Sequence, residues 1–552
     1  MKGLFNKLQG WLKGGEVHVF LEFFVLALFI FYPILKPGFV FALDLVFVPE
    51  LRMPAWLFND FAIRSFFYLL NFILSSAAIE KGLLFFVVIF SGVGMYRLVK
   101  TKSEWPRYFA GILYIFNPFF YERLAVGQVF LLLGYALLPW AIISALRFFR
   151  QPTLRQAVKT GLWLGIIPLV NLHSVVFFGL FLAIYFLGEV ISNYQTKVSS
   201  QLVTRYFVVI VLICLAINSF WLWPSIFSAD SYAKDINNIS LDENLETFRS
   251  QADPQFGLTF NLLSLFGFWG EGRGVFADLK ATQPLWPVIS SILLVLALWG
   301  WIVRRNKSED ASLTRSLFIL SVVSFFLSIS TNFRFFYPLF SFSLLKIFRE
   351  PQKFISLLVL AYAFFGAWAL EDISRRIKGK WGSLLLGIIL ILPMLNTYIL
   401  FAGLKGQLAP HKYPQSWYQV ENILRNDKDD FKVLFLPWHS YLSFSFLDNK
   451  LINNPAQCPT NCFFSKPIIS SNDMELRGIA SAKNEMSKFV IKDLLNIESD
   501  SDLGTTMKDR GIKYIILAEE VDYEKYDFLK NQKDLKEVYY EGGLRLFRNL
   551  VW

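Results

Sequence analysis

The sequence predicts a polytopic α-helical membrane protein that carries a soluble α/β domain at the C-terminal end of the chain. Three observations predict this fold class. Hydrophobic residues make up 55% of the 552 residues, whereas soluble domains contain about 45–50%. Several windows of about 20 residues carry almost no charge, and this is the length that a helix needs to cross a bilayer. Residues 403–552 contain no such window.

Eleven segments are apolar enough to be membrane spans. They cover residues 17–35, 82–99, 107–121, 128–147, 160–173, 174–192, 206–227, 284–303, 314–331, 354–371 and 381–402. Residues 54–72 have a different pattern, which is typical of an amphipathic helix that lies at the membrane interface.

The distribution of basic residues predicts the topology. The formal charge of +11 is spread over short loops near residues 100–107, 147–159, 197–205, 304–315 and 375–380. Every second loop is basic, as the positive-inside rule requires if the N-terminus is cytoplasmic. This pattern favours a membrane topology signal over a nucleic-acid-binding surface. We therefore expect outer loops at 36–81, 228–283 and 332–353 and an extracytoplasmic C-terminal end.

The C-terminal segment 403–552 is expected to form an α/β domain outside the cytoplasm, after a transmembrane domain of residues 1–402. "KVLFLPW" (432–438) and "YIILAEEV" (514–521) are typical of buried strands, and "KEVYYEGGLRLFR" (536–548) of a hairpin that turns at its two glycines. The segment 414–427 and the residues before 511 are expected to be helical.

The three cysteines indicate no metal centre. Cys214 lies within an expected span, whereas Cys458 and Cys462 are close together in "CPTNC". Two cysteines without a pair of histidines make an incomplete zinc site. If this segment lies outside the cytoplasm, a disulfide between Cys458 and Cys462 is expected.

A carboxylate follows the first expected span. In "GFVFALDLVFVPELR" (38–52), Asp44 is flanked by apolar residues, and Glu50 and Arg52 come shortly after it. The ordinary alternative is a solvated loop residue. The other interpretation is a general base that acts on a polar acceptor while a lipid-linked donor stays in the bilayer. Partial burial would raise the pKa of Asp44 toward a value that suits a base.

Three motifs carry a resemblance to the GT-C superfamily of membrane glycosyltransferases. "LYIFNPFFYERLAVGQVFLLLGYALLPW" (113–140), "FALDLVFVPE" (41–50) and "LKIFREPQKFISLL" (345–358) resemble segments of YfhO-type membrane proteins and of the large mycobacterial arabinofuranosyltransferases. The resemblance implies a GT-C-like membrane fold and transfer of a lipid-linked sugar. It assigns Asp44, and after it Glu50, the role of base or metal ligand. Some GT-C enzymes need a divalent cation, so the metal of this chain is left open.

Two residues of the membrane part are further candidates for substrate binding. Arg123 lies between two apolar spans, where a charged group is costly and usually functional. Its guanidinium would suit a lipid phosphate, and the alternatives are pairing with Glu122 or snorkelling to the interface. His173 lies at an expected outer turn. It could be a metal ligand or a phosphate contact, although a lone histidine is more often structural.

The outer loops hold the remaining candidates. In "FGFWGEGRGVF", Trp269 could stack on a sugar ring, and Glu271 with Arg273 could bracket its hydroxyls. The alternative is an ordinary glycine-rich turn. In "FREPQKF", Arg349 and Lys353 are four residues apart, so a helix would place both cations on one face, toward a donor phosphate. Interfacial anchoring is the alternative.

These expectations favour an inverting glycosyltransferase. It would move a sugar from a polyprenyl-phosphate donor to an extracytoplasmic glycan, lipid or protein acceptor. The alternative is a transporter or flippase of lipid-linked glycans, or a non-catalytic assembly protein of the cell envelope. Transporters tend to place polar residues near the middle of their spans, whereas the candidates here gather at one end. No dinucleotide fingerprint, P-loop or zinc-protease motif is present.

Overall fold

The computed structural model describes residues 17–54, 59–192, 197–227, 245–307, 311–340, 348–457, 462–471, 485–496 and 503–552. The chain divides into two compact units. The helical unit comprises Met1–Tyr32, Trp56–Ile63 and Gly82–Gln407, and the sheet unit comprises Pro33–Ala55, Arg64–Lys81 and Leu408–Trp552. Each unit is described by itself.

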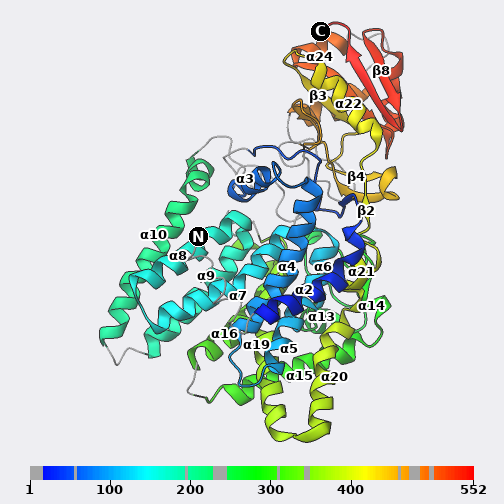
Figure 1. Cartoon of the computed structure of the whole chain (residues 1–552). Coiled ribbons are helices and arrows are strands. Elements are labelled where there is room, and N and C mark those ends of the chain that lie inside the picture. The colour runs from blue at the N-terminus through cyan, green and yellow to red at the C-terminus, as the bar shows by residue number, and fades with distance from the viewer. Residues whose placement is uncertain are drawn as a thin grey trace. The chain divides into compact units, whose positions relative to one another are not determined.

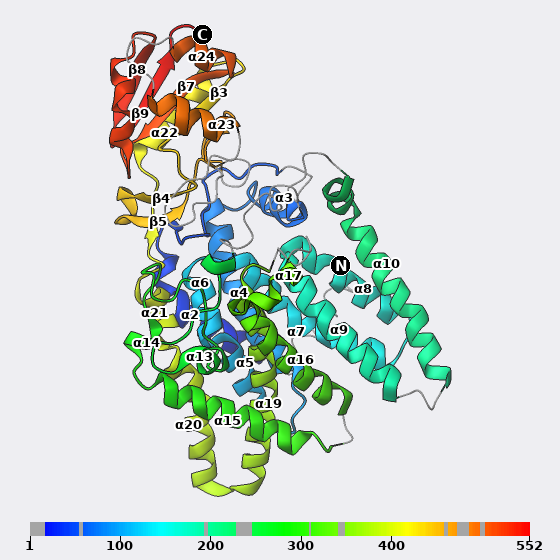
Figure 2. The same ribbon diagram turned by 180° about the vertical axis from the view of Figure 1, so that it is seen from behind.

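The helical unit is almost entirely α-helical (Figures 1 and 2). Its longer helices are α2 (Val17–Phe31), α4 (Ser76–Leu98, which begins in the other unit), α5 (Trp105–Ile115), α6 (Pro118–Ala125), α7 (Val129–Arg150), α8 (Leu154–Val170), α9 (Leu172–Ser192), α10 (Lys197–Phe227), α15 (Trp286–Arg304), α16 (Ala311–Ile329), α19 (Ile355–Arg376) and α20 (Gly379–Asn396). Short helices lie between them: α13 (Gly257–Leu263), α14 (Leu279–Thr282), α17 (Tyr337–Phe340), η4 (Pro351–Phe354) and α21 (Phe401–Lys405).

Nine helices of the described ranges are long and apolar enough to cross a membrane, so the expected count of eleven is not confirmed. The two expected spans that do not qualify are the shortest ones. Residues 107–121 fall into α5 and α6, because Pro118 lacks the backbone N–H that would continue the helix and Asn117 caps α6 instead. The other, expected at 160–173, is α8, which has 17 residues.

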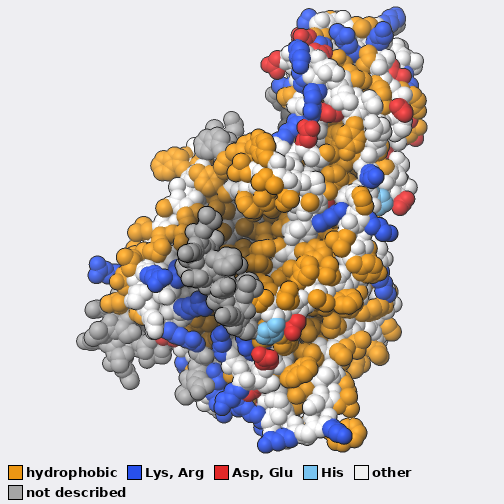
Figure 3. Space-filling model, in the orientation of Figure 1, with side chains coloured by type: hydrophobic (Ala, Val, Ile, Leu, Met, Phe, Trp, Pro, Cys, Tyr) orange, Lys and Arg blue, Asp and Glu red, His pale blue; other side chains and the backbone are white. Residues whose placement is uncertain are grey.

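The surface of the helical unit suits a lipid environment. Large apolar side chains are exposed along the spans, for example Phe29 of α2 and Val295 of α15, and orange side chains cover much of the face shown in Figure 3. Lys and Arg gather at the lower end of this view. Among the described residues, exposed basic side chains follow α15 and end α19, such as Arg305 and Arg376. The protein is therefore an integral membrane protein.

Helix α19 forms the centre of the helical unit. It packs against α15, α5 and α16, and 94% of its most apolar window is buried. The 3-10 helix η4 leads directly into it. A polar residue at this end of α19 is therefore held inside the protein and not against lipid.

The sheet unit contains a five-stranded sheet with strand order β6-β3-β7-β9-β8. The strands are β3 (Lys432–Leu436), β6 (Ile468–Ile469), β7 (Ile512–Ala518), β8 (Leu535–Glu541) and β9 (Leu544–Asn549). Strand β3 is parallel to β6 and β7, whereas β9 is antiparallel to both β7 and β8. The predicted strands and the hairpin at Gly542 and Gly543 are present, together with the predicted helices α22 (Gln415–Asn426) and α24 (Leu503–Asp509).

The loop after α2 belongs to the sheet unit. Its strand β1 (Phe39–Val40) pairs with β2 (Pro410–His411), and the hairpin of β4 (Tyr441–Phe444) and β5 (Lys450–Asn453) lies in the same unit. Of the predicted amphipathic segment 54–72, residues Phe61–Leu70 form helix α3, while residues 55–58 lie outside the described ranges. Cys458 also lies outside them, so its disulfide with Cys462 stays a prediction.

Candidate functional site

A buried ion network centred on Glu350 is the main candidate site of the helical unit. Arg123 Nη1 lies 2.8 Å from Glu350 Oε2, and Lys353 Nζ lies 3.2 Å from Glu350 Oε1. Relative side-chain exposures are 1% for Arg123, 7% for Glu350 and 9% for Lys353. Charged side chains are almost never this buried unless they are paired, and here two cations share one carboxylate.

The break in the helix before α6 positions Arg123. Asn117 adopts an extended conformation, and its side chain accepts a hydrogen bond from the backbone N–H of Phe120. Arg123 then falls in the last turn of α6, where a cation is favoured by the helix dipole. Gly127 follows with φ +78°, which redirects the chain into α7. Arg123 Nη1 also donates to Gln128 Oε1 at 2.8 Å in this turn.

The start of η4 positions the other two charges. Glu350 precedes the helix and Pro351 is its first residue, so Glu350 and Lys353 lie one turn apart. The expectation that Arg349 and Lys353 share a helical face was wrong. The helix begins only at Pro351, because the extended conformation that precedes a proline leaves Arg349 outside it.

Opposite charges keep Glu350 ionised. Burial alone would raise the pKa of this carboxyl, but the positive charges of Lys353 and Arg123 outweigh burial, and Arg349 adds to them. The result is a pKa well below the usual range. Arg123 and Lys353 both contact this one carboxylate, so these three groups together carry more positive than negative charge. Such a group of cations can accept an anionic ligand.

His173 is part of the same network. Its Nε2 lies 3.2 Å from Lys353 Nζ. An ammonium group can only donate, so His173 accepts through Nε2 when this bond is made. The ring packs edge-on against Phe348, with ring centroids 5.1 Å apart. The structure thus brings together three of the predicted residues, Arg123, His173 and Lys353, from α6, α9 and η4.

Two buried polar side chains beside the network lack hydrogen-bond partners among the described residues. Gln352 has no accessible surface, and neither its Oε1 nor its Nε2 makes a hydrogen bond. Ser356, one turn further along, is also buried, and its Oγ has no hydrogen-bond partner among the described residues. Leaving a buried donor or acceptor without a partner costs about 1–3 kcal/mol. Gln352 can therefore be satisfied by a polar ligand.

A second network surrounds Glu271. Lys280 Nζ contacts Glu271 Oε2 at 2.6 Å and Asp253 Oδ2 at 3.1 Å, and the backbone N–H of Gly267 donates to Glu271 Oε1. Glu122, which adjoins Arg123, lies near the Glu271 carboxylate. Burial and the Glu271 carboxylate raise the pKa of Glu122 well above its usual range. The ion pair of Arg123 is made with Glu350.

The glycine-rich loop places its predicted residues in different surroundings. Glu271 turns inward to Lys280, whereas Arg273 is exposed, donates to the Thr247 carbonyl at 2.9 Å and lies 5.4 Å from the Trp269 ring centre. The two side chains that were expected to bracket a sugar together are thus held apart. Trp269 remains a candidate contact, because its buried Nε1 has no partner within the described ranges.

Aromatic rings connect this loop to the main network. The Arg123 guanidinium lies 4.1 Å from the Phe268 ring centre. The Arg349 guanidinium lies 4.8 Å from the ring centre of Phe248. Phe248 in turn packs edge-on against Trp269, with ring centroids 5.3 Å apart. Arg349, Trp269 and Arg123 therefore belong to one cluster of cations and aromatic rings within the helical unit.

Asp44 lies in the sheet unit, at a tight turn. The backbones of Ala42 and Leu45 exchange hydrogen bonds of 3.1 Å across this turn. Leu43 points inward while Asp44 is exposed and accepts a hydrogen bond of 3.0 Å from the Tyr441 hydroxyl. The expectation that Asp44 is partly buried was wrong, because the turn directs its side chain outward between two buried neighbours.

Glu50 and Arg52 lie in the same unit but make different contacts. Glu50 forms an exposed ion pair with Arg425, whose Nη2 is 2.7 Å from Glu50 Oε2. Arg52 is partly buried. Burial lowers the pKa of its guanidinium, and the negative charges of Glu421 and Glu50 oppose this shift. Glu50 is therefore held in an ion pair, and Asp44 is hydrogen-bonded to Tyr441.

The described residues offer no ready site for a metal ion. Nowhere in these ranges do three His, Cys, Asp or Glu side chains come together as a ligand set. The carboxylates of Glu271 and Asp253 converge on the ammonium group of Lys280, which takes the place that a cation would fill. The side chains present thus do not fit the divalent cation of some GT-C enzymes.

Four residues of the two networks were missed by reasoning from the sequence: Glu350 as the central anion, Gln352, Lys280 and Asp253. Glu350 pairs with Arg123 across 227 positions, and no local pattern encodes such a contact. The signal that could have been followed is the charge-rich "REPQK" segment before an apolar span, where every polar side chain that becomes buried needs a partner.

Comparison with solved structures gives a match over almost the whole chain. The cryo-EM structure of the arabinofuranosyltransferase AftD from Mycobacteria superposes with a TM-score of 0.64 at 14% identity, over 96% of this chain and 40% of that chain. A mutant form of AftD gives a TM-score of 0.61 over 97% of this chain. This chain therefore has the fold of AftD and spans about two fifths of its length.

The other comparisons add little. The oligosaccharyltransferase of Archaeoglobus fulgidus, in complex with zinc and sulfate, matches with a TM-score of 0.45 at 12% identity, over 96% of this chain and 73% of that chain. No protein-family model and no curated protein sequence matches the chain. The fold assignment consequently rests on the two AftD structures.

Proposed function

We propose that this integral membrane protein, whose fold is that of the arabinofuranosyltransferase AftD, is a glycosyltransferase. It would transfer a sugar from a polyprenyl-phosphate donor to an extracytoplasmic glycan, lipid or protein acceptor. The observation that supports the proposal best is the buried pair of cations, Arg123 and Lys353, which share the single carboxylate of Glu350.

A lipid-linked phosphate suits this pair for two reasons. Arg presents a planar fork of donors that matches phosphate oxygens, and Lys adds a compact positive charge. An incoming phosphate would gain both cations without loss of the Glu350 contacts that position them. The side-chain amide of Gln352, which has no hydrogen-bond partner among the described residues, would form a hydrogen bond with the sugar that the phosphate carries.

The position of the network favours transfer over transport. Arg123 precedes α7, Glu350 precedes α19, and His173 and Lys353 lie in the first turns of their spans. All four thus lie at the ends of spans, whereas transport sites lie near the middle of the membrane. A donor whose lipid stays in the bilayer presents its phosphate at such an end.

The proposed reaction is a single displacement. The acceptor hydroxyl oxygen forms a bond to the anomeric carbon as the bond from that carbon to the phosphate oxygen breaks. The bonding electrons leave with the lipid phosphate, whose charge Arg123 and Lys353 stabilise. Asp44 is proposed as the base that takes the hydroxyl proton, by resemblance to GT-C enzymes. One displacement inverts the anomeric centre.

A transfer assay on the full chain in nanodiscs tests the proposal. Purified protein is incubated with a panel of polyprenyl-phosphate sugars and a membrane-extract acceptor, and product is quantified. Loss of a general base typically lowers the rate about a hundred- to ten-thousand-fold, and Asp44→Asn should do so. Asp430→Asn, which removes another exposed carboxylate of the sheet unit, is the matched control and should retain activity.

Two outcomes would contradict parts of the proposal. Full activity of Asp44→Asn would remove the base assignment and leave Glu50 as the next residue to test. Absence of transfer from every donor, together with ATP-independent movement of an intact lipid-linked glycan across vesicles that contain the protein, would replace the transferase with a transporter.

A further inference from the structure

The sheet unit contains a pocket that the proposed transfer reaction does not use. It has a volume of about 280 Å³ and lies between the start of α22, the end of β4, the end of β7 and the β8–β9 turn. In parallel α/β sheets, ligands bind beyond the carboxyl ends of the strands, and Ala518 and Glu520 place this pocket at that end of β7.

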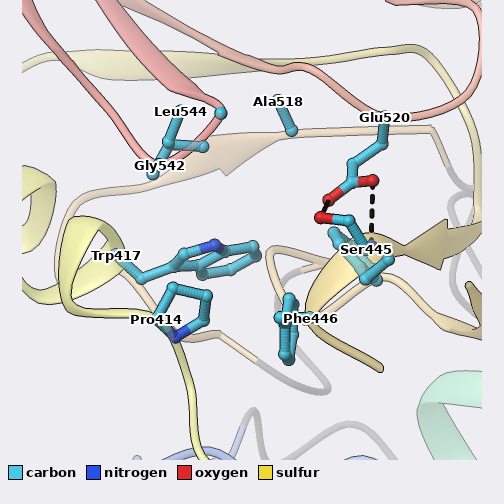
Figure 4. A pocket seen from close by; sticks show the side chains of 10 residues that line it. Pro414, Trp417, Ser445, Phe446, Ala518, Glu520, Gly542 and Leu544 are labelled. Carbon is cyan, nitrogen blue, oxygen red and sulfur yellow. Dashed lines mark hydrogen bonds between the residues drawn. The ribbon is translucent and has the colours of Figure 1, made fainter. Parts of the chain in front are cut away.

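One wall of the pocket is the indole of Trp417. One face of this ring is covered by Phe464, with centroids 5.4 Å apart and planes 15° apart. Phe444 packs edge-on against it. Figure 4 shows the Trp417 ring reaching into the pocket, with Ala518 on the strand above it and Glu520 and Ser445 on the far side. Trp417 is only 3% exposed, so a ligand would meet just the part of the indole that lines the pocket.

The opposite wall carries a fixed carboxylate. Glu520 Oε2 accepts from the Ser445 backbone N–H and Oε1 from the Ser445 hydroxyl, each at 3.0 Å. A carboxylate has about four lone-pair positions, so two remain for a ligand. Beside the pocket, the buried Ser416 Oγ has no partner in the described chain and lies 3.3 Å from where a Cβ on Gly542 would be.

We infer that this pocket binds a single sugar ring of a neutral glycan. The ring would place one C–H face against the part of Trp417 that lines the pocket and donate hydroxyl hydrogens to Glu520. The volume of about 280 Å³ is close to the lower limit of about 300 Å³ for small-molecule pockets, which suits one ring. The carboxylate excludes phosphates and acidic sugars. An organic cation is the other ligand of an aromatic wall with a carboxylate, and the binding test below separates the two.

Binding by the full chain in nanodiscs tests this inference without any transfer reaction. Saturation-transfer difference NMR is recorded with a panel of methyl glycosides, both hexoses and pentoses, in pyranose and furanose rings. The wild type should bind at least one saturably. Glu520→Gln should weaken that binding about tenfold or more, the usual effect of losing a charged hydrogen-bond acceptor. Ala518→Leu should abolish it by filling the pocket.

Glu524→Gln is the matched control, because it removes an exposed carboxylate that does not line the pocket, and it should bind as the wild type does. Saturable binding that persists in Glu520→Gln and Ala518→Leu would place the sugar elsewhere and overturn the inference. So would the absence of saturable binding by every glycoside, or binding of tetramethylammonium that both variants abolish. Because the readout is binding alone, failure here is distinguishable from failure of the proposed transfer reaction.

Discussion

Arg123 and Glu350 are 227 positions apart in the chain and form a buried ion pair in which Nη1 and Oε2 are separated by 2.8 Å. Arg123 comes from the short helix α6 and Glu350 from the residue before η4. The pair thus joins the α5–α7 region to the end of the central helix α19. This contact both stabilises the helical unit and holds the cations of the proposed donor site.

Removal of one partner of this pair should be strongly destabilising. Glu350→Gln would leave Arg123 and Lys353 buried without their carboxylate, and loss of one partner of a buried pair costs about 3–5 kcal/mol. The measurement is the free energy of unfolding in mixed micelles for Glu350→Gln, Arg123→Met and the double variant. The loss of unfolding free energy in the double variant should be smaller than the sum of the two single losses, by about 0.5–3 kcal/mol. Strict additivity would show that the pair is not coupled.

Gln352→Met should separate ligand binding from stability. Methionine has a similar volume and no hydrogen-bonding requirement, so the ligand-free protein should be as stable as the wild type or more so, by up to about 1–3 kcal/mol. If Gln352 contacts the donor, the same substitution should weaken donor binding. Thermal unfolding of the ligand-free protein gives its stability, and titration of the same preparation with donor gives the binding affinity. A clear loss of stability would mean that the Gln352 amide is satisfied within the folded protein.

Lys450 predicts a pH dependence of the sheet unit. Burial lowers the pKa of Lys450 to about 8, whereas an unfolded lysine titrates near about 10.4. Between these values the unfolded state binds more protons than the folded state, so stability rises with pH in this window. Below pH 8 Lys450 is protonated in both the folded and the unfolded state, so this group adds no pH dependence to the stability.

Comparison with Lys450→Met isolates this effect, because all other groups titrate alike in both proteins. The unfolding temperature of the wild type, measured relative to that of the variant, should increase from pH 8 to pH 10. A constant difference over this range would contradict the assignment of the lowered pKa to Lys450.

Cysteine labelling of intact cells tests the predicted topology. Glu524→Cys in the sheet unit and Lys102→Cys after α4 introduce exposed thiols, in a background in which Cys214, Cys458 and Cys462 are each replaced by Ser. An impermeant maleimide should label position 524 in intact cells and position 102 only after lysis, because the alternating basic loops place the latter in the cytoplasm. The reverse pattern would invert the orientation and place the proposed acceptor side in the cytoplasm.

Much of the fold could be predicted from the sequence because it depends on local patterns. Hydropathy located nine qualifying spans, and period-two apolar patterns with a Gly-Gly turn located β3, β7 and the β8–β9 hairpin. The break at Asn117 and Pro118 was misjudged as one span, although a capping residue before a proline is itself a start signal. The bounds of α8 were also misjudged, because this helix covers Leu154–Val170 and not residues 160–173.

The candidate site was only partly predictable. Arg123, His173 and Lys353 were recognised because charged or titratable groups beside spans are expensive unless they have a role. Their shared partner Glu350 and the unmatched amide of Gln352 follow from tertiary packing, which the sequence does not encode locally. The exposure of Asp44 depends on a turn between Ala42 and Leu45 that the surrounding apolar residues concealed.

The central claim is that Arg123 and Lys353 bind the phosphate of a lipid-linked sugar. The most direct test is the affinity of the full chain in nanodiscs for a short-chain polyprenyl-phosphate sugar, measured beside the phosphate-free polyprenyl glycoside of the same sugar. Lys353→Met is compared with Lys412→Met, which removes a lysine outside the network. We expect the wild type and Lys412→Met to prefer the phosphate-bearing lipid, and Lys353→Met to lose about tenfold or more of that preference. Equal affinity of the wild type for both lipids, or an unchanged preference in Lys353→Met, would contradict the account.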